Sequence, residues 1–153
     1  NKGVINNIPN INRISFVDPK KDKFSYYKNT DVITPNIIEL EKVTKKKLND
    51  IKSIVDECRQ LIQENNFKYI VTKRGSKGMV VVGENFYENI TVDIVKNPDV
   101  TGAGDTVISV LSLVYFQTKD IIHSAKIANR CASEIVKKEG TNSISLKELN
   151  LIR

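Results

Sequence analysis

Residues 99–106, with the sequence DVTGAGDT, join a short β-type segment to the most apolar helical segment of the chain. Gly102 and Gly104 stand one residue apart, so the backbone can turn tightly and present its N–H groups outward. A helix that begins at such a turn adds the positive end of its dipole. Residues 99–106 therefore have the features of a phosphate-binding turn.

Asp105 stands at the foot of this turn, where a carboxylate would repel a phosphate group. Its presence is explained if it takes a proton from a hydroxyl group that attacks the phosphate. The alternative is a tight strand-to-helix turn in which the helix dipole favours an acidic residue. No Gly-Lys-Ser/Thr sequence follows and the third glycine of Gly-x-Gly-x-x-Gly is absent, which excludes the Walker A and dinucleotide motifs.

Strand-like and helix-like patterns alternate along the chain, which predicts an α/β fold with a mostly parallel sheet. Apolar runs at residues 14–18 and 31–34 each end at a proline, as buried strands do. From residue 46 to residue 65 the apolar side chains form the stripe of an amphipathic helix. Residues 67–72 and 79–82 predict two strands that pair antiparallel through a glycine turn.

Strand-like and helix-like segments also alternate after residue 86. Residues 86–87 and 91–95 predict two short edge strands. Residues 107–116 are apolar almost all round, which predicts a buried helix, and another helix is expected from about residue 121 to residue 138.

Length and composition indicate one globular domain over residues 1–153, because 40% of the residues are hydrophobic and 27% are charged. No apolar run approaches the roughly 18 residues of a membrane span, so we expect no membrane partner. The start of the chain has no leader pattern, and we expect a cytoplasmic protein. Residue 1 is Asn and the only methionine is Met79, so we expect a fragment of a longer protein.

The net charge of +6 raises the hypothesis of a nucleic-acid binder. The lysines are scattered and have no interleaved aromatic residues, which favours solvated surface and no nucleic-acid partner. Cys58 and Cys131 lie far apart in helical patterns, without metal-ligand spacing. We expect two buried thiols rather than the alternative of a disulfide.

Residues 99–106 resemble the C-terminal signature of the PfkB-type, ribokinase-like carbohydrate kinases. Further segments resemble other motifs of that family in the right order. Residues 17–20 resemble its Asp-Pro strand end, residues 33–39 its Asn-x-x-Glu motif and residues 75–78 its glycine turn beside the nucleotide. Residues 128–129 and 139–141 resemble the helix and the loop that flank the adenine. The wording DPK, FSYY and TPN resembles in particular the heptose 7-phosphate kinases of lipopolysaccharide-core synthesis, whose fuller form often carries an adenylyltransferase domain.

The resemblance implies the C-terminal half of a ribokinase-like three-layer fold. The N-terminal sugar-binding and lid part of the family is absent from these 153 residues. It also implies ATP and Mg²⁺ as cofactors, with a monovalent cation near Asp99 in some members. The expected partner is a small sugar or sugar phosphate. A homodimer, or a separate chain that supplies the missing half, is also possible on this sequence.

The resemblance also assigns roles to individual residues. Asp105 matches the catalytic base, and the backbone amides of Gly102, Ala103 and Gly104 match the anion hole for the transferred phosphoryl group. The nucleotide would contact residues in three places: Lys73, Gly75 and Gly78; Thr101; and Asn129.

Several of these positions have a second interpretation. Asn36 and Glu39 match the motif that organises Mg²⁺, largely through water, but they also fit a helix cap. Asn129 also fits a polar residue on a helix surface. Lys73 and Arg74 stand where many members of the family have Thr-Leu. Two interpretations are open: one of the two side chains contacts a phosphate, or both are solvated.

Three classes of function follow from these features. The leading hypothesis is an ATP-dependent kinase that phosphorylates the anomeric hydroxyl of heptose 7-phosphate, or another sugar such as ribose or a fructose phosphate. The second is a nucleotide-binding remnant that is inactive by itself. The third, a basic nucleic-acid binder, has only the net charge in its favour.

Overall fold

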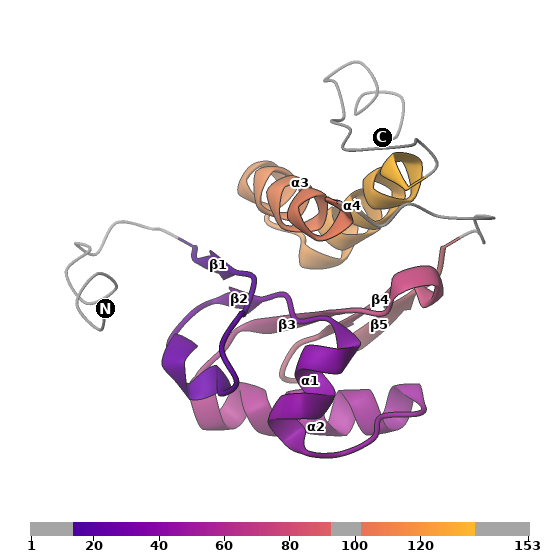
Figure 1. Ribbon diagram of the computed structural model, residues 1–153. Helices are drawn as coiled ribbons and strands as arrows, with labels where there is room; N and C mark the ends of the chain where they lie inside the picture. The colour runs from indigo at the N-terminus through magenta and orange to yellow at the C-terminus, as the bar shows by residue number, and fades with distance from the viewer. Residues whose placement is uncertain (1–13, 93–101, 137–153) are drawn as a thin grey trace.

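The computed structural model describes residues 14–92 and 102–136. In this part of the chain a five-stranded sheet lies between two layers of helices (Figure 1). The strands stand in the sheet in sequence order: β1 (Phe16–Val17), β2 (Val32–Ile33), β3 (Tyr69–Lys73), β4 (Met79–Val82) and β5 (Tyr87–Ile90).

The sheet has a parallel part and a hairpin part. β1 pairs parallel with β2, and β2 pairs parallel with β3. β4 is antiparallel to both of its neighbours, β3 and β5. Four of these five strands therefore run in one direction, which confirms the mostly parallel sheet and the antiparallel pairing through the glycine turn.

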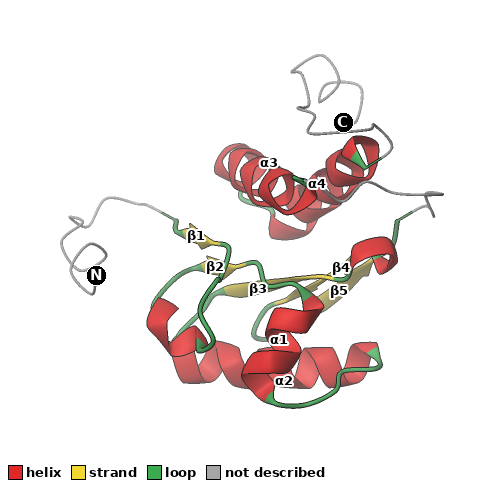
Figure 2. Cartoon of the chain, viewed as in Figure 1, coloured by secondary structure: helices red, strands yellow, loops and turns green. Residues whose placement is uncertain are grey.

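Helices α1 (Ile37–Thr44) and α2 (Ile51–Asn65) cover one face of the sheet (Figure 2). The helix predicted from residue 46 begins later, at Ile51, because the Asp50 side chain caps it by accepting a hydrogen bond of 2.7 Å from the Ser53 amide. Residues 46–49 belong instead to the connection after α1. Leu48 in this connection is still buried, so its place in the apolar stripe is explained by the core rather than by the helix.

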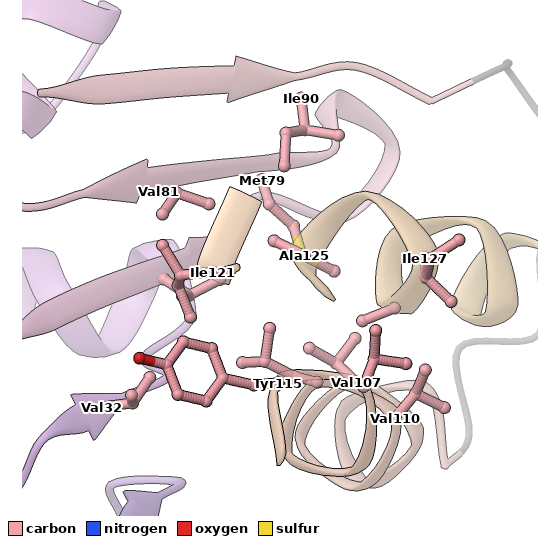
Figure 3. Packing of buried hydrophobic residues seen from close by; sticks show 14 of the residues in the cluster. Val32, Met79, Val81, Ile90, Val107, Val110, Tyr115, Ile121, Ala125 and Ile127 are labelled. Atoms are coloured by element: carbon pink, nitrogen blue, oxygen red, sulfur yellow. The ribbon is translucent and has the colours of Figure 1, made fainter. Parts of the chain in front are cut away.

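Helices α3 (Ala103–Thr118) and α4 (Ile121–Ile135) cover the opposite face. Figure 3 shows side chains of both helices meeting side chains of the sheet, among them Val107 of α3, Ile121 of α4 and Val81 of β4. The prediction that α3 is a buried helix is correct for one side only, since 46% of Leu113 and 69% of Phe116 are exposed. As an outer-layer helix, α3 contacts the sheet and α4 with one side only.

The edge of the sheet also differs from the prediction. The strand predicted at residues 86–87 is β5, which begins at Tyr87 and extends to Ile90, because Gly83 and Phe86 close a tight turn and β5 then pairs with β4 along its whole length. Of the strand predicted at residues 91–95, residues 91 and 92 do not belong to a strand. Residues 93–95 lie outside the described part of the chain.

Two further expectations can be compared with the described residues. Cys58 and Cys131 are free, buried thiols, as predicted. Within residues 14–92 and 102–136, no helix combines the length and the apolar character that a membrane span needs.

Gly78 is a position where the backbone admits no side chain. Its φ is +78°, and a Cβ atom there would overlap with the carbonyl oxygen of Ile90. We expect Gly78→Ala to lower the free energy of unfolding by about 3 kcal/mol or more, from backbone strain together with the clash. Urea unfolding monitored by circular dichroism measures this change.

Gly75→Ala is the matched control in the same turn. Gly75 also has a positive φ, of +58°, but a Cβ atom there would meet nothing within 4 Å. The expected loss is the backbone strain alone, about 1–2 kcal/mol. Equal losses in the two variants would contradict the close packing of Gly78 against β5.

Candidate active site

A cavity of about 580 Å³ opens where the parallel strands end and helix α3 begins. Ligands of open α/β sheets bind at this location, outside the carboxyl ends of the strands. The cavity is lined by residues from β1 to α4: Asp18, Lys20, Asn36, Ile37, Ile38, Lys73, Arg74, Gly75, Ser76, Gly78, Met79, Val92, Gly102, Ala103, Gly104, Asp105, Val107, Asn129, Ala132, Ser133 and Val136.

Asp18 joins the ends of three strands on one wall of this cavity. It follows β1 directly, and its Oδ1 atom accepts a hydrogen bond of 2.5 Å from the Nζ atom of Lys73, the last residue of β3. Thr34, which follows β2, donates to the same oxygen at 3.3 Å. The Oδ2 atom pairs with the Lys20 Nζ atom at 2.7 Å. One carboxylate therefore holds two ammonium groups.

The two lysines determine the protonation of Asp18. Burial by itself raises the pKa of Asp18, but the hydrogen bonds from Lys20 and Lys73 outweigh burial and hold the pKa below the ordinary value of 3.8. The hydrogen bond to Asp18, helped by the charges of Glu39 and Asp105, raises the pKa of Lys20. Asp18 and Lys20 are therefore both charged near neutral pH.

The first turn of α3 forms the opposite wall. Gly102 is the N-cap residue with a φ of +77° and so provides no capping side chain, whereas α1, α2 and α4 are each capped by a side chain. A Cβ atom on Gly102 would meet nothing within 4 Å, which shows open space above the turn. Asp105 lies in this first turn, is exposed and lines the cavity.

Lys73 brings its positive charge to this same turn. Its Nζ atom lies 3.7 Å from the position that a Cβ atom on Gly104 would take. Only 14% of the Lys73 side chain is exposed, so a solvated role for this lysine is excluded. Helix N-termini favour anions and disfavour cations. A lysine beside the start of α3 therefore concentrates positive potential where an anion can enter.

Asn36 and Glu39 form a reciprocal helix cap. The Asn36 side chain accepts from the Glu39 amide, and the Glu39 Oε2 atom accepts from the Asn36 amide, both at 2.8 Å. The helix-cap interpretation is thus confirmed. Asn36 lines the cavity, while the Oε1 atom of Glu39 lies 3.9 Å from the Lys20 Nζ atom. The described residues include no cluster of three or more His, Cys, Asp or Glu side chains that could bind a metal directly.

The remaining residues singled out from the sequence divide into two groups. Gly75, Gly78 and Asn129 all line the cavity. Asn129 is buried and donates a hydrogen bond of 3.0 Å to the Thr91 carbonyl oxygen, so the surface interpretation of this residue is wrong. Thr101 lies outside the described part of the chain.

Arg74 and Asp99 were also singled out from the sequence. Arg74 lines the cavity and donates a hydrogen bond of 3.1 Å to Asn89. Asp99, like residues 139–141, lies outside the described part of the chain.

The contacts of Asp18 and Lys20 were not predicted from the sequence. In the sequence, Asp18 belongs to a segment that resembles an Asp-Pro strand end, and this resemblance assigns it no contact. An acidic residue directly after a buried parallel strand was an available signal, because such strand ends meet at one edge of the sheet. The apolar side of the cavity, which is formed by Met79, Val92, Ala132 and Val136, was not predicted either.

The lowered pKa of Asp18 predicts a pH-dependent contribution to stability. The ionised carboxylate stabilises the fold, so its contribution is complete above about pH 5 and is lost as the pH falls through the folded-state pKa, below 3.8. Asp18→Asn should therefore lower stability near neutral pH, and its difference from the wild type should shrink on acidification.

Thermal unfolding measured from neutral pH to about pH 2.5 tests this dependence. Asp22→Asn is the control, because Asp22 is an exposed acid in the same loop. It should follow the wild-type curve. A constant difference between Asp18→Asn and the wild type at every pH would contradict the ion-pair account.

Comparison with known proteins supports the family resemblance. The model of the pfkB family of carbohydrate kinases matches residues 3–148. The bifunctional protein HldE of Marinomonas sp. (strain MWYL1) is 34% identical over 139 residues, which cover 90% of this chain and 29% of that protein. The HldE protein of Shewanella baltica (strain OS185) is 37% identical over 134 residues, covering 87% and 28%. The chain spans less than a third of the length of these curated relatives.

Solved structures show the same fold at low sequence identity. Phosphofructokinase-2 from Escherichia coli in complex with potassium superposes with a TM-score of 0.80 at 18% identity, over 91% of this chain and 46% of that chain. Arabidopsis thaliana ribokinase complexed with ribose and ATP gives a TM-score of 0.81 at 20% identity, over 91% and 47%. These structures confirm the predicted ribokinase-like fold, and the family match extends over nearly the whole sequence: the chain belongs to the pfkB family of carbohydrate kinases.

Proposed function

We propose that this chain is the nucleotide-binding half of an ATP-dependent sugar kinase in which Asp105 is the catalytic base. One observation carries the proposal: an exposed carboxylate, a glycine turn at a helix N-terminus and a mostly buried lysine face a single cavity. This combination suits the transfer of a phosphoryl group to a hydroxyl group.

The cavity has an apolar side and a charged side, as a nucleotide needs. Met79, Val92, Ala132 and Val136 offer an apolar surface, and the glycines at positions 75 and 78 leave room for a flat ring. Adenine would lie here, near Asn129. The triphosphate would extend from this side toward the start of α3.

The charged side can stabilise the transferred phosphoryl group. Backbone amides of Gly102, Ala103 and Gly104 at the start of α3 would donate to its oxygens, because the first amides of a helix have no partner within the helix. The Lys73 ammonium group, beside Gly104, would neutralise part of the phosphate charge. The family resemblance adds Thr101 to the proposed contacts of the nucleotide.

Asp105 would activate the acceptor. Its carboxylate takes the proton of a sugar hydroxyl, the resulting oxygen bonds to the γ-phosphorus, and the bond between the β–γ bridging oxygen and that phosphorus breaks to release ADP. An exposed side chain in the first turn of α3 is free to meet a hydroxyl that enters from the open side of the cavity.

Magnesium fits this site in an indirect way. Mg²⁺ keeps several water ligands and binds substrate phosphates with one or two protein groups. The helix cap uses Oδ1 of Asn36 and Oε2 of Glu39, which leaves Oε1 of Glu39, beside Lys20, to accept hydrogen bonds from metal-bound water. Asn36 and Glu39 would orient the water ligands of a bound Mg²⁺, whose charge would lower the repulsion between the phosphates.

The acceptor proposed for this kinase is the anomeric hydroxyl of heptose 7-phosphate. The basis is the wording of the DPK and TPN segments, which resembles the heptose 7-phosphate kinases. Ribose or a fructose phosphate is the alternative acceptor. The chain corresponds to about half of the ribokinase and phosphofructokinase-2 chains that it superposes on, so residues outside it would contribute to the choice of sugar.

The proton-transfer role of Asp105 can be tested by substitution. In the full-length protein, Asp105→Asn should lower turnover by about 10²–10⁴-fold, since the hydroxyl loses its base, while ATP still binds. Release of ADP with heptose 7-phosphate and with a panel of other sugars measures this effect. Asp56→Asn removes an exposed carboxylate from α2, on the far face of the sheet, and should leave turnover unchanged.

Unchanged turnover in Asp105→Asn would refute the base assignment. Nucleotide binding by the wild type without turnover of any sugar would favour the nucleotide-binding module instead of the kinase.

The phosphate role of Lys73 has its own test. Lys73→Met should weaken binding of ATP by about tenfold or more, because an ionic hydrogen bond to a phosphate is lost, and should leave adenosine binding within about twofold. Titration calorimetry with each ligand separates the two effects. Lys77→Met removes the same charge from an exposed position in the same turn and should change neither. Equal weakening of ATP by both substitutions would indicate a general effect of net charge.

A further inference from the structure

Asp18 lies in a cavity that suits a polyanion, yet it brings a negative charge there. Its side chain is only 12% exposed, and it faces Lys73, Lys20 and Thr34. By charge alone, Asp18 should oppose the binding of a triphosphate. The contacts of Asp18 give it a different role.

Lys73 needs a partner to remain where it lies. A lysine side chain has a flexible four-carbon stem, and fixing it costs rotamer entropy. Its position beside the first turn of α3 is also opposed by the positive end of the helix. The Asp18 carboxylate offsets both costs through a hydrogen bond of 2.5 Å with the Lys73 ammonium group.

The carboxylate itself is connected to two paired strands. Asp18 follows β1 directly, and β1 is paired with β2 through the register Val17↔Ile33. The Thr34 amide donates to the Val17 carbonyl at 2.9 Å, and the Thr34 hydroxyl lies 3.3 Å from Asp18 Oδ1. The ends of β1 and β2 thus fix an anchor for the side chain that projects from the end of β3.

We propose that Asp18 is a positioning residue for the nucleotide's phosphates, which holds the Lys73 ammonium group at the start of α3 and acts on the nucleotide only through Lys73. This inference rests on the proposed function, since it assumes that phosphates bind at this turn. In this role the charge of Asp18 makes no direct contact with the ligand. Its consequence is that removing a negative charge weakens the binding of an anion.

The experiment is a double-substitution cycle in the full-length protein, with Asp18→Asn, Lys73→Met and the combined variant. Titration calorimetry measures the affinity for ATP with magnesium chloride and, separately, for adenosine, which lacks phosphates. Asp18→Asn should weaken ATP about tenfold and adenosine by less than about twofold, because only the phosphate contact loses its support. In the Lys73→Met background, Asp18→Asn should have no further effect on ATP.

Three results would overturn the inference. ATP affinity that is unchanged or increased in Asp18→Asn would show that Asp18 acts as a simple repulsive charge. Weakening that persists in the Lys73→Met background would show a route that bypasses Lys73. Equal weakening of ATP and adenosine would show a structural role.

Two checks separate this inference from folding and from the proposed function. If Asp18→Asn binds neither ligand, Asp18→Glu replaces it in the experiment, because this variant keeps the charge but moves the ammonium group. Weaker binding of ATP with unchanged binding of adenosine would then support the positioning role. Loss of binding of both ligands would overturn it. If the wild type binds ATP no better than adenosine, the phosphate site of the proposed function fails instead.

Discussion

The central strands of the sheet are buried on both faces, and this constraint organises the rest of the molecule. Successive side chains of β4 point to opposite faces, so that Val81 packs against α3 and α4 while Val80 and Val82 pack against α1 and α2. Among the residues of β2, β3 and β4 the only charged side chain is that of Lys73, and it stands at the end of its strand. The cavity therefore forms at the carboxyl edge of the parallel strands, and the helices that bury the sheet also supply its walls.

Opposite charges share this cavity, and their arrangement explains how they are tolerated together. Asp18 balances Lys73 and Lys20, so the group of lysines does not require a bound anion in order to fold. Asp105 lies in the first turn of α3, forms no ion pair with a lysine of residues 14–92 and 102–136, and is exposed to the cavity. The same site thus holds one carboxylate that is paired with two lysines and one carboxylate that is exposed to the cavity.

Features encoded in short stretches of sequence were predictable. The alternation of strand and helix patterns, the hairpin through the glycine turn, and the Asn36–Glu39 cap all depend on neighbours a few residues apart. The errors arose where a local pattern had a tertiary cause. Leu48 continues an apolar stripe although Asp50 starts the helix after it, and Phe116 is apolar although its side of α3 has no cover in the described part of the chain.

By itself, the sequence determined the order of elements, the glycine turn before α3 and the acidic residue in that first helical turn, because propensity, periodicity and capping act over short distances. The tertiary structure alone decided that Asp18 and Lys73, 55 residues apart, form one ion pair beside Gly104. That contact requires the order and register of β1, β2 and β3, which result from packing both faces of the sheet at once. No local sequence pattern predicts which strand ends will be neighbours in the sheet.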